Sequence, residues 1–121
     1  MQRKVLFVDD EKIVLDILAT LFQSRGYVAL CTTNGNQALE IIKFEGVRVC
    51  LVDLRMPAID GVLLCRQIKQ MDPLVSVFAL SAYVDLYTPE QFKEFGFNGH
   101  FSKPFKIQEL IGAVDKCFAA E

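Results

Sequence analysis

Hydrophobic residues along the chain fall into short apolar runs that alternate with stretches of helical spacing. The first run, Val5 to Val8, is rich in strand-forming residues and ends abruptly at three consecutive acids. Apolar residues then recur every three or four positions up to Gly26, which predicts a helix with one apolar face and a glycine stop. The same alternation continues to the end of the chain, with further predicted strands at 27–31, 47–52, 75–80 and 100–102, each followed by a predicted helix.

The predicted strands are apolar along almost their whole length, apart from Arg48 in the third. Strands of this kind are buried on both faces, as in a parallel sheet covered by helices on each side and joined by right-handed crossovers. The pattern therefore predicts a doubly wound α/β fold. A length of 121 residues suits one compact domain, and we expect residues 1–121 to form it.

The segment that follows the fourth predicted strand carries the sequence signals of a helix start. Thr88 is a good N-cap, Pro89 suits the first helical position, and Gln91 stands three residues after the cap. We therefore expect the fourth helix to begin near Pro89. Residues 81–87 would then form a long loop beside the strand ends, where switching elements are commonly found.

Polar residues stand where the predicted strands end. Asp9 and Asp10 follow the first strand, Asp53 follows the third, Ser81 the fourth and Lys103 the fifth. In a doubly wound sheet, ligands bind outside the carboxyl ends of the strands, at the point where the strand order reverses. We therefore expect these five residues, from four separate stretches of sequence, to form one polar cluster.

This cluster has the composition of a phosphoryl-transfer site. Three carboxylates held together repel one another, and a divalent cation would relieve the repulsion. Mg²⁺ suits this site best because it prefers carboxylate oxygens and waters as ligands, and Ca²⁺ and Mn²⁺ are the alternatives. Asp53 would act as a nucleophile toward phosphorus, while Lys103 and the Ser81 hydroxyl would stabilise the transferred group.

Each of these residues also has an ordinary structural interpretation. A pair of acids favours a helix N-terminus, Asp53 could be a turn or cap residue ahead of Pro57, and a lone lysine is usually a solvated surface charge. Their joint placement at four strand ends favours the phosphoacceptor interpretation.

Composition and charge exclude several classes of function. The net charge of −2, with dispersed Lys and Arg, predicts no nucleic-acid binding by this chain. The four cysteines lie in separate apolar stretches without metal-site spacing, so we expect buried, reduced thiols. The first apolar run is too short for a signal peptide or a membrane span, which predicts a cytoplasmic protein with no membrane contact.

Four motifs, in this order, carry a resemblance to a known family: Val8-Asp9-Asp10-Glu11, then Val52-Asp53-Leu54-Arg55-Met56-Pro57 with Asp60-Gly61, then Leu80-Ser81-Ala82, then Lys103-Pro104-Phe105. Together they resemble the receiver domain of two-component response regulators, over essentially the whole chain. The resemblance implies a flavodoxin-like receiver fold whose five parallel strands have the order 2-1-3-4-5.

The resemblance also implies a metal site around the phosphoacceptor. Asp53 would take the phosphoryl group, as an aspartyl phosphate, in the presence of Mg²⁺. Asp10 and Asp53 would bind Mg²⁺ directly, together with the backbone carbonyl of Arg55, and Asp9 would act largely through water.

Two further positions would respond to the phosphoryl group. Lys103 would pair with the phosphoryl group, and its bond to Pro104 would be cis. Ser81 would move toward the phosphoryl group. His100 stands where the family usually has Tyr or Phe. Because histidine can titrate near neutral pH, its burial would depend on pH or its coupling to the site would be weaker.

By the same resemblance the chain would be a signalling switch rather than an enzyme, with self-catalysed phosphorylation and dephosphorylation only. It would receive its phosphoryl group from a histidine kinase or a histidine phosphotransfer protein. The face formed by the fourth helix, fifth strand and fifth helix would then control an unidentified partner or output domain. Whether two copies of the chain form a homodimer is left open by the sequence.

Three other functions compete with this one. A phosphohydrolase of similar scaffold would need a spaced Asp pair after its first strand, whereas Asp9 and Asp10 are adjacent. A nucleotide-binding module would need a glycine-rich turn there, where this chain has three acids. A receiver-like module that binds partners without phosphorylation stays open, because of His100.

Overall fold

The computed structural model describes residues 2–54, 56, 60–81 and 87–119. Within them, strands and helices alternate along the chain: β1 (Lys4–Val8), α1 (Lys12–Gln23), β2 (Val28–Thr32), α2 (Gly35–Glu45), β3 (Val49–Asp53), α3 (Gly61–Met71), β4 (Ser76–Ser81), α4 (Pro89–Phe95), β5 (Gly99–Ser102) and α5 (Ile107–Ala119). The predicted alternation is confirmed, and each strand lies within a residue or two of its predicted place.

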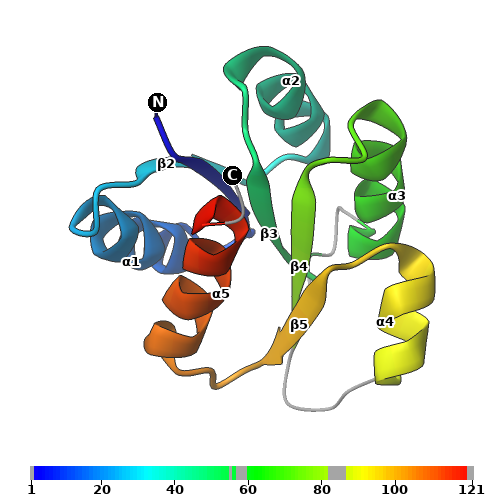
Figure 1. Cartoon of the computed structure of the whole chain (residues 1–121). Helices are drawn as coiled ribbons and strands as arrows, with labels where there is room; N and C mark the ends of the chain where they lie inside the picture. The colour runs from blue at the N-terminus through cyan, green and yellow to red at the C-terminus, as the bar shows by residue number, and fades with distance from the viewer. Residues whose placement is uncertain (1, 55, 57–59, 82–86, 120–121) are drawn as a thin grey trace.

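The strands form one parallel sheet in the order β2-β1-β3-β4-β5. Helices cover both faces: α1 and α5 lie on one side, and α2, α3 and α4 on the other (Figure 1). The doubly wound fold and the strand order 2-1-3-4-5 are therefore confirmed. β3 occupies the centre of the sheet, and all five of its residues are buried.

Two hydrophobic clusters, one on each face of the sheet, hold the helices in place. Alternate residues of β1 point to opposite clusters: Leu6 packs with α2, α3 and α4, while Phe7 packs with α1 and α5. Both side chains are at most 1% exposed. Because the strands are buried on both faces, almost all of their residues are hydrophobic, and hydrophobic and polar residues do not alternate along them.

The helix boundaries follow local sequence signals. α4 begins as predicted at Pro89, where Thr88 and Gln91 form a reciprocal capping box. α3 begins after Asp60, whose carboxylate accepts hydrogen bonds from the backbone N–H groups of Val62 and Leu63. α1 ends at Gln23, so Gly26 lies in the turn beyond the helix, with a φ of 85° that favours glycine.

The prediction that all four cysteines are buried is wrong in part. Cys50 and Cys65 are buried, but Cys117 is half-buried and Cys31 is exposed. Cys31 lies on β2, an edge strand with only one neighbour, where an apolar run does not imply burial on both faces. All four are free thiols.

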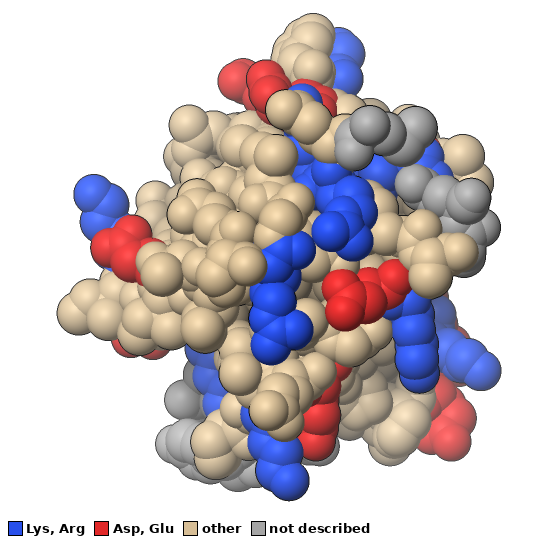
Figure 2. Space-filling model, turned by 60° about the vertical axis from the view of Figure 1, so that its left-hand side comes forward, with Lys and Arg blue, Asp and Glu red and all other residues tan. Residues whose placement is uncertain are grey.

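In the described part of the chain, every helix falls short of the length and apolar character needed to cross a membrane. On the face shown in Figure 2, basic and acidic side chains are interspersed among uncharged ones.

Candidate functional site

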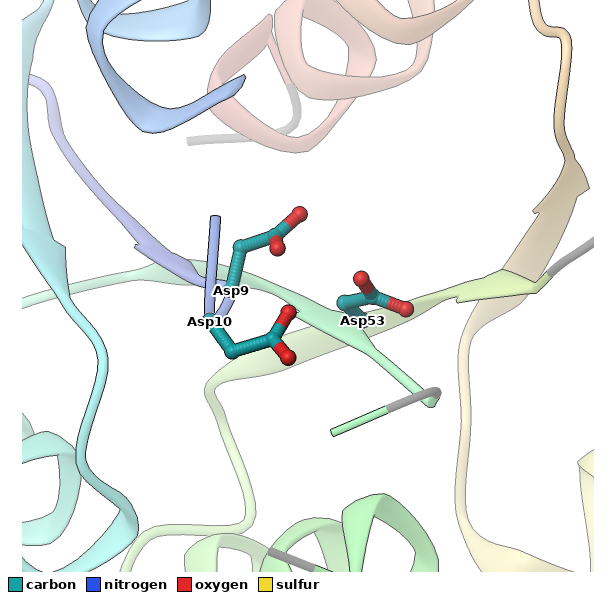
Figure 3. Close-up of side chains that lie close together, drawn as sticks. All are labelled: Asp9, Asp10 and Asp53. Atoms are coloured by element: carbon teal, nitrogen blue, oxygen red, sulfur yellow. The ribbon is translucent and has the colours of Figure 1, made fainter. Parts of the chain in front are cut away.

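Three carboxylates meet at the carboxyl ends of β1 and β3, which are neighbours in the sheet. Asp53 is the last residue of β3, and Asp9 and Asp10 directly follow β1. One oxygen from each lies within 4.8 Å of the others, and all three side chains turn toward a common space (Figure 3). Asp9 and Asp53 are buried, whereas Asp10 is exposed at the rim. The predicted convergence of these residues is thus a feature of the structure.

Asp9 is held in a setting that disfavours its charge. Its side chain is 1% exposed, and its Oδ1 accepts a hydrogen bond of 2.9 Å from the backbone N–H of Glu11. Its Oδ2 is buried and has no hydrogen-bond partner. Burial raises the pKa of Asp9 to about 6, and the negative charge of Asp53 acts in the same direction. The hydrogen bond from Glu11 and the positive charge of Lys103 oppose this rise only in part.

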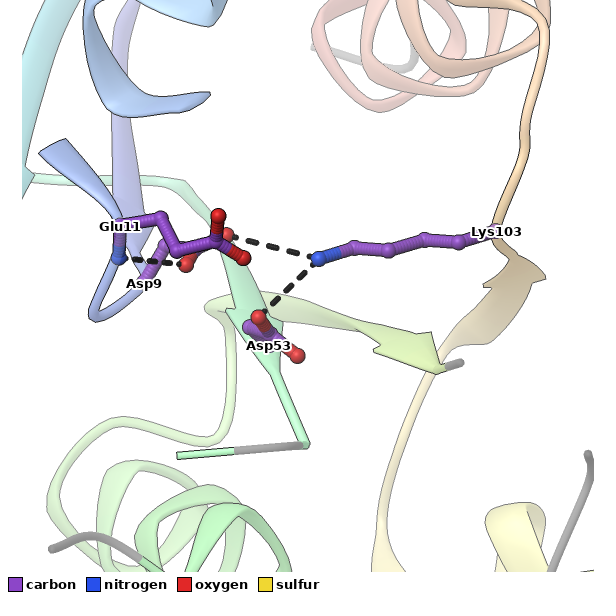
Figure 4. Close-up of polar contacts among 4 residues, drawn as sticks. All are labelled: Asp9, Glu11, Asp53 and Lys103. Carbon is purple, nitrogen blue, oxygen red and sulfur yellow. Dashed lines mark hydrogen bonds and ion pairs between the residues drawn. The ribbon is translucent and has the colours of Figure 1, made fainter. Parts of the chain in front are cut away.

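Lys103 supplies the positive charge of the site. Its Nζ donates a hydrogen bond to Asp53 Oδ2 at 3.1 Å and lies 3.7 Å from Asp9 Oδ2 (Figure 4). Burial by itself would lower the pKa of Lys103, but the hydrogen bond to Asp53 and the charges of Asp53 and Asp9 outweigh it and raise the pKa. The bond from Lys103 to Pro104 is cis, as expected.

Ser81 and Lys103 are joined through the backbone. Ser81 is the last residue of β4 and is 5% exposed. The backbone N–H of Lys103 donates to the Ser81 carbonyl at 2.7 Å. In the sheet, Leu80 is paired with Asp53, so Ser81 follows the residue beside the predicted phosphoacceptor.

His100 belongs to a different part of the molecule. It lies on β5, and its half-buried ring stacks on Phe92 of α4 with 4.4 Å between ring centroids and 14° between ring planes. His100 and Phe92 line a cavity of about 270 Å³ between α4 and β5. The predicted switch residue therefore contacts α4 and is separated from the acids by β4.

Two expectations fall outside the described residues. One is the backbone carbonyl of Arg55 as a metal ligand, and the other is the loop at 82–86, which includes Ala82 of the third motif.

One residue near the site was not singled out by its sequence. Glu11 has its side chain across Asp9, on the side of Lys103 (Figure 4). The signal was the third acid of the run at residues 9–11, but the direction of its side chain cannot be read from a run of acids.

The donor set fits a hard divalent cation. Carboxylate oxygens are the ligands that Mg²⁺ prefers, and three of them converge here. The buried Asp9 Oδ2, which lacks a hydrogen-bond donor, is the kind of atom that a metal or a metal-bound water would satisfy. Lys103 neutralises part of the negative charge, but its Nζ lies 3.7 Å from Asp9 Oδ2 and makes no hydrogen bond to it.

Fold and site together define a class of protein: a flavodoxin-like α/β domain that gathers acids and one lysine at the carboxyl ends of its parallel strands. Comparison with known proteins narrows the class. The sequence profile of the response regulator receiver domain matches residues 5–115. The chain therefore belongs to the response-regulator receiver family, whose members act in two-component signalling as phosphoacceptor switches rather than as turnover enzymes, typically with Mg²⁺ at an acidic pocket.

Individual relatives agree with this assignment. The chain is 35% identical over 116 residues to sporulation initiation phosphotransferase F of Bacillus subtilis, covering 96% of this chain and 94% of that protein. The receiver domain of the Francisella response regulator 1452 matches with a TM-score of 0.89 at 28% identity, covering 98% of both chains. A response regulator described as putative, from Chloroflexus aurantiacus, matches with a TM-score of 0.87 at 28% identity, covering 98% of this chain and 99% of that one.

Proposed function

We propose that Asp53 accepts a phosphoryl group from a phosphohistidine of a histidine kinase or histidine phosphotransfer protein. One observation carries the proposal: Asp53 is a buried carboxylate within reach of two further carboxylates and, at 3.1 Å, of the Lys103 ammonium. The similarity to a phosphotransferase of a sporulation system supports a protein phosphodonor of this kind. In this proposal residues 1–121 act as one receiver domain.

The chain's own residues would divide the work of holding the metal. Asp10 and Asp53 would ligate Mg²⁺ directly, with the Arg55 backbone carbonyl as a third ligand, and Asp9 would act through water. Asp9 fits that part because its Oδ2 is buried without a hydrogen-bond donor. When bound, Mg²⁺ would neutralise charge on the phosphoryl oxygens and so favour attack by a carboxylate.

In the transfer step, a carboxylate oxygen of Asp53 attacks phosphorus. A new O–P bond forms, the P–N bond of the phosphohistidine breaks, and its electron pair stays on the imidazole nitrogen. Lys103 is already hydrogen-bonded to Asp53, so its ammonium can pass to a phosphoryl oxygen over a short distance. Its pKa is raised, which keeps it protonated throughout the neutral range.

Ser81 and His100 would transmit the change to the output face, made of α4, β5 and α5. A hydroxyl at Ser81 can donate to a phosphoryl oxygen, and Ser81 is tied to β5 through its carbonyl and the Lys103 N–H. His100, on β5, contacts α4 through Phe92. A partner or output domain bound to that face would sense the movement.

The substitution Asp53→Asn tests the proposal. We expect incubation with Mg²⁺ and a small phosphodonor to label the wild type with one acid-stable, base-labile acyl phosphate, and Asp53→Asn to abolish that label because the amide is not a nucleophile. Intact-protein mass spectrometry measures it. Glu40→Gln, an exposed substitution on α2, serves as the control. Undiminished labelling of the Asn variant at another residue would refute the assignment of Asp53.

A further inference from the structure

Glu11 occupies an unusual place at the start of α1. It is the N-cap residue of the helix, yet its side chain makes no capping hydrogen bond. Its backbone N–H contacts the site by donating a hydrogen bond of 2.9 Å to Asp9 Oδ1. Because Glu is not among the residues that cap a helix well, the side chain contributes little to α1, and a neutral replacement should leave the helix start intact.

The Glu11 side chain instead faces the mouth of the acidic site. In Figure 4 it extends across Asp9, on the side from which Lys103 enters. Burial lowers the pKa of Lys103, but Asp53 and Asp9 raise it, and the carboxylate of Glu11 is near enough for its charge to add a smaller effect in the same upward direction. Glu11 is exposed, whereas Asp9 and Asp53 are buried beneath the surface.

A fixed negative charge at this mouth has opposite consequences for the two species that must enter. It attracts a divalent cation and repels a phosphodonor that carries two negative charges. In water, unit charges a few ångströms apart interact weakly, and salt screens the effect beyond about 10 Å at 0.1 M. Moderate changes of opposite sign are therefore expected from one residue.

We infer that Glu11 is a selectivity residue that strengthens Mg²⁺ binding while slowing phosphorylation of Asp53 by small dianionic phosphodonors. The inference rests on the proposed function. It favours a protein phosphodonor, which can bring its own contacts to the surface, over small metabolites that carry an activated phosphoryl group and must enter against the charge of Glu11.

The experiment compares the wild type with Glu11→Gln, and with Glu40→Gln as a control that removes the same charge from an exposed position on α2. Mg²⁺ affinity is measured by calorimetric titration with the metal alone, at low and at high salt. Phosphorylation rates are measured at saturating Mg²⁺ with acetyl phosphate, a dianion, and with phosphoramidate, which has a net charge of about −1 near neutral pH. Transfer from acetyl phosphate forms the O–P bond to Asp53 and releases acetate.

We expect Glu11→Gln to weaken Mg²⁺ binding about threefold at low salt and to speed phosphorylation by acetyl phosphate by about the same factor. The gain should be smaller with phosphoramidate, and both effects should shrink at 0.5 M salt. Glu40→Gln should change neither. A merely structural role for Glu11 predicts something else, because a loosened site would lose metal affinity and rate together.

Two results would overturn the inference: a Glu11→Gln variant equal to the wild type in both measurements, or one that loses rate along with affinity. Failure of the proposed function looks different. If the wild type binds Mg²⁺ but neither it nor Glu11→Gln, which lacks the repelling charge, takes a phosphoryl group from acetyl phosphate, phosphoramidate or a phosphohistidine protein, that function is refuted, and the Mg²⁺ affinities of the two variants still decide the metal half of the inference.

Discussion

At the scale of single residues, the site is a cluster of charges that do not balance. Two buried carboxylates, Asp9 and Asp53, share one ammonium, and Asp9 Oδ2 has no hydrogen-bond donor. Burial raises the pKa of Asp9 to about 6, so near neutral pH its charge is maintained at a cost. A cation at this place would remove that cost, which links metal binding to stability.

This imbalance predicts a pH dependence of the metal-free protein. Because the pKa of Asp9 lies near 6 when folded and near 3.8 when unfolded, the folded state binds more protons between these values. The contribution of Asp9 to the free energy of unfolding should therefore fall as pH rises from about 4 to above 6. Urea unfolding at pH 5 and 7.5, with and without Mg²⁺, measures it.

Asp9→Asn isolates the effect, because it removes the titrating group while keeping the shape of the side chain. Without metal, the wild type should lose stability relative to Asp9→Asn as pH rises, and saturating Mg²⁺ should remove that loss. A difference between the two proteins that stays constant with pH in the absence of metal would contradict the assignment.

At the scale of elements, α4 is a short helix whose start is set by local signals. It has seven residues, fewer than an isolated helix needs to be stable, and one of its side chains, Phe92, is buried. Its start is fixed by the pair Thr88 and Gln91, whose side chains accept from each other's backbone N–H at 3.1 and 2.8 Å. Since His100 stacks on Phe92, the placement of α4 also sets the position of the predicted switch residue.

Removing the cap should therefore loosen this helix first. We expect Thr88→Ala to lower the free energy of unfolding by about 1 kcal/mol, with Thr88→Ser close to the wild type because it keeps the hydroxyl. Urea unfolding gives the total effect, and amide hydrogen exchange shows whether it is concentrated in α4. Equal stability of the Ala and Ser variants would show that the capping box contributes nothing.

At the scale of the whole molecule, the sheet connects the acidic site to the α4 side. Asp53 ends the central strand, Ser81 ends the next one, and the backbone of Lys103 is hydrogen-bonded to Ser81 beyond that. From Lys103, which directly follows β5, the chain runs back along β5 to His100, which contacts α4. A group bound at Asp53 thus has a route to the proposed output face through the hydrogen bonds of Lys103, the chain of β5 and the stacking of His100 on Phe92.

Beryllofluoride with Mg²⁺, a stand-in for the acyl phosphate, tests that route. We expect it to shift the backbone NMR resonances of Ser81, Lys103 and His100 as well as that of Asp53. The Asp53→Asn variant under the same conditions should show no such shifts, because it lacks the carboxylate that binds the beryllium. Shifts confined to Asp53 would indicate binding without switching.

Much of this protein can be predicted from its amino-acid sequence. Apolar runs and helical spacing indicate the order of elements, and Thr88 with Pro89 indicates the start of α4, because these signals act over a few neighbouring residues. The meeting of Asp9, Asp10 and Asp53 is also predictable, since parallel strands deliver their carboxyl ends to one edge of the sheet.

Other features depend on contacts between distant segments. Cys31 is exposed because β2 lies at the edge of the sheet, which its apolar sequence does not reveal. The unsatisfied Oδ2 of Asp9, the distance from Lys103 to Asp53, and the turn of Glu11 over the site all depend on side-chain directions fixed by packing. Local sequence sets which residues reach the edge of the sheet, whereas long-range packing sets the distances and the burial on which their chemistry depends.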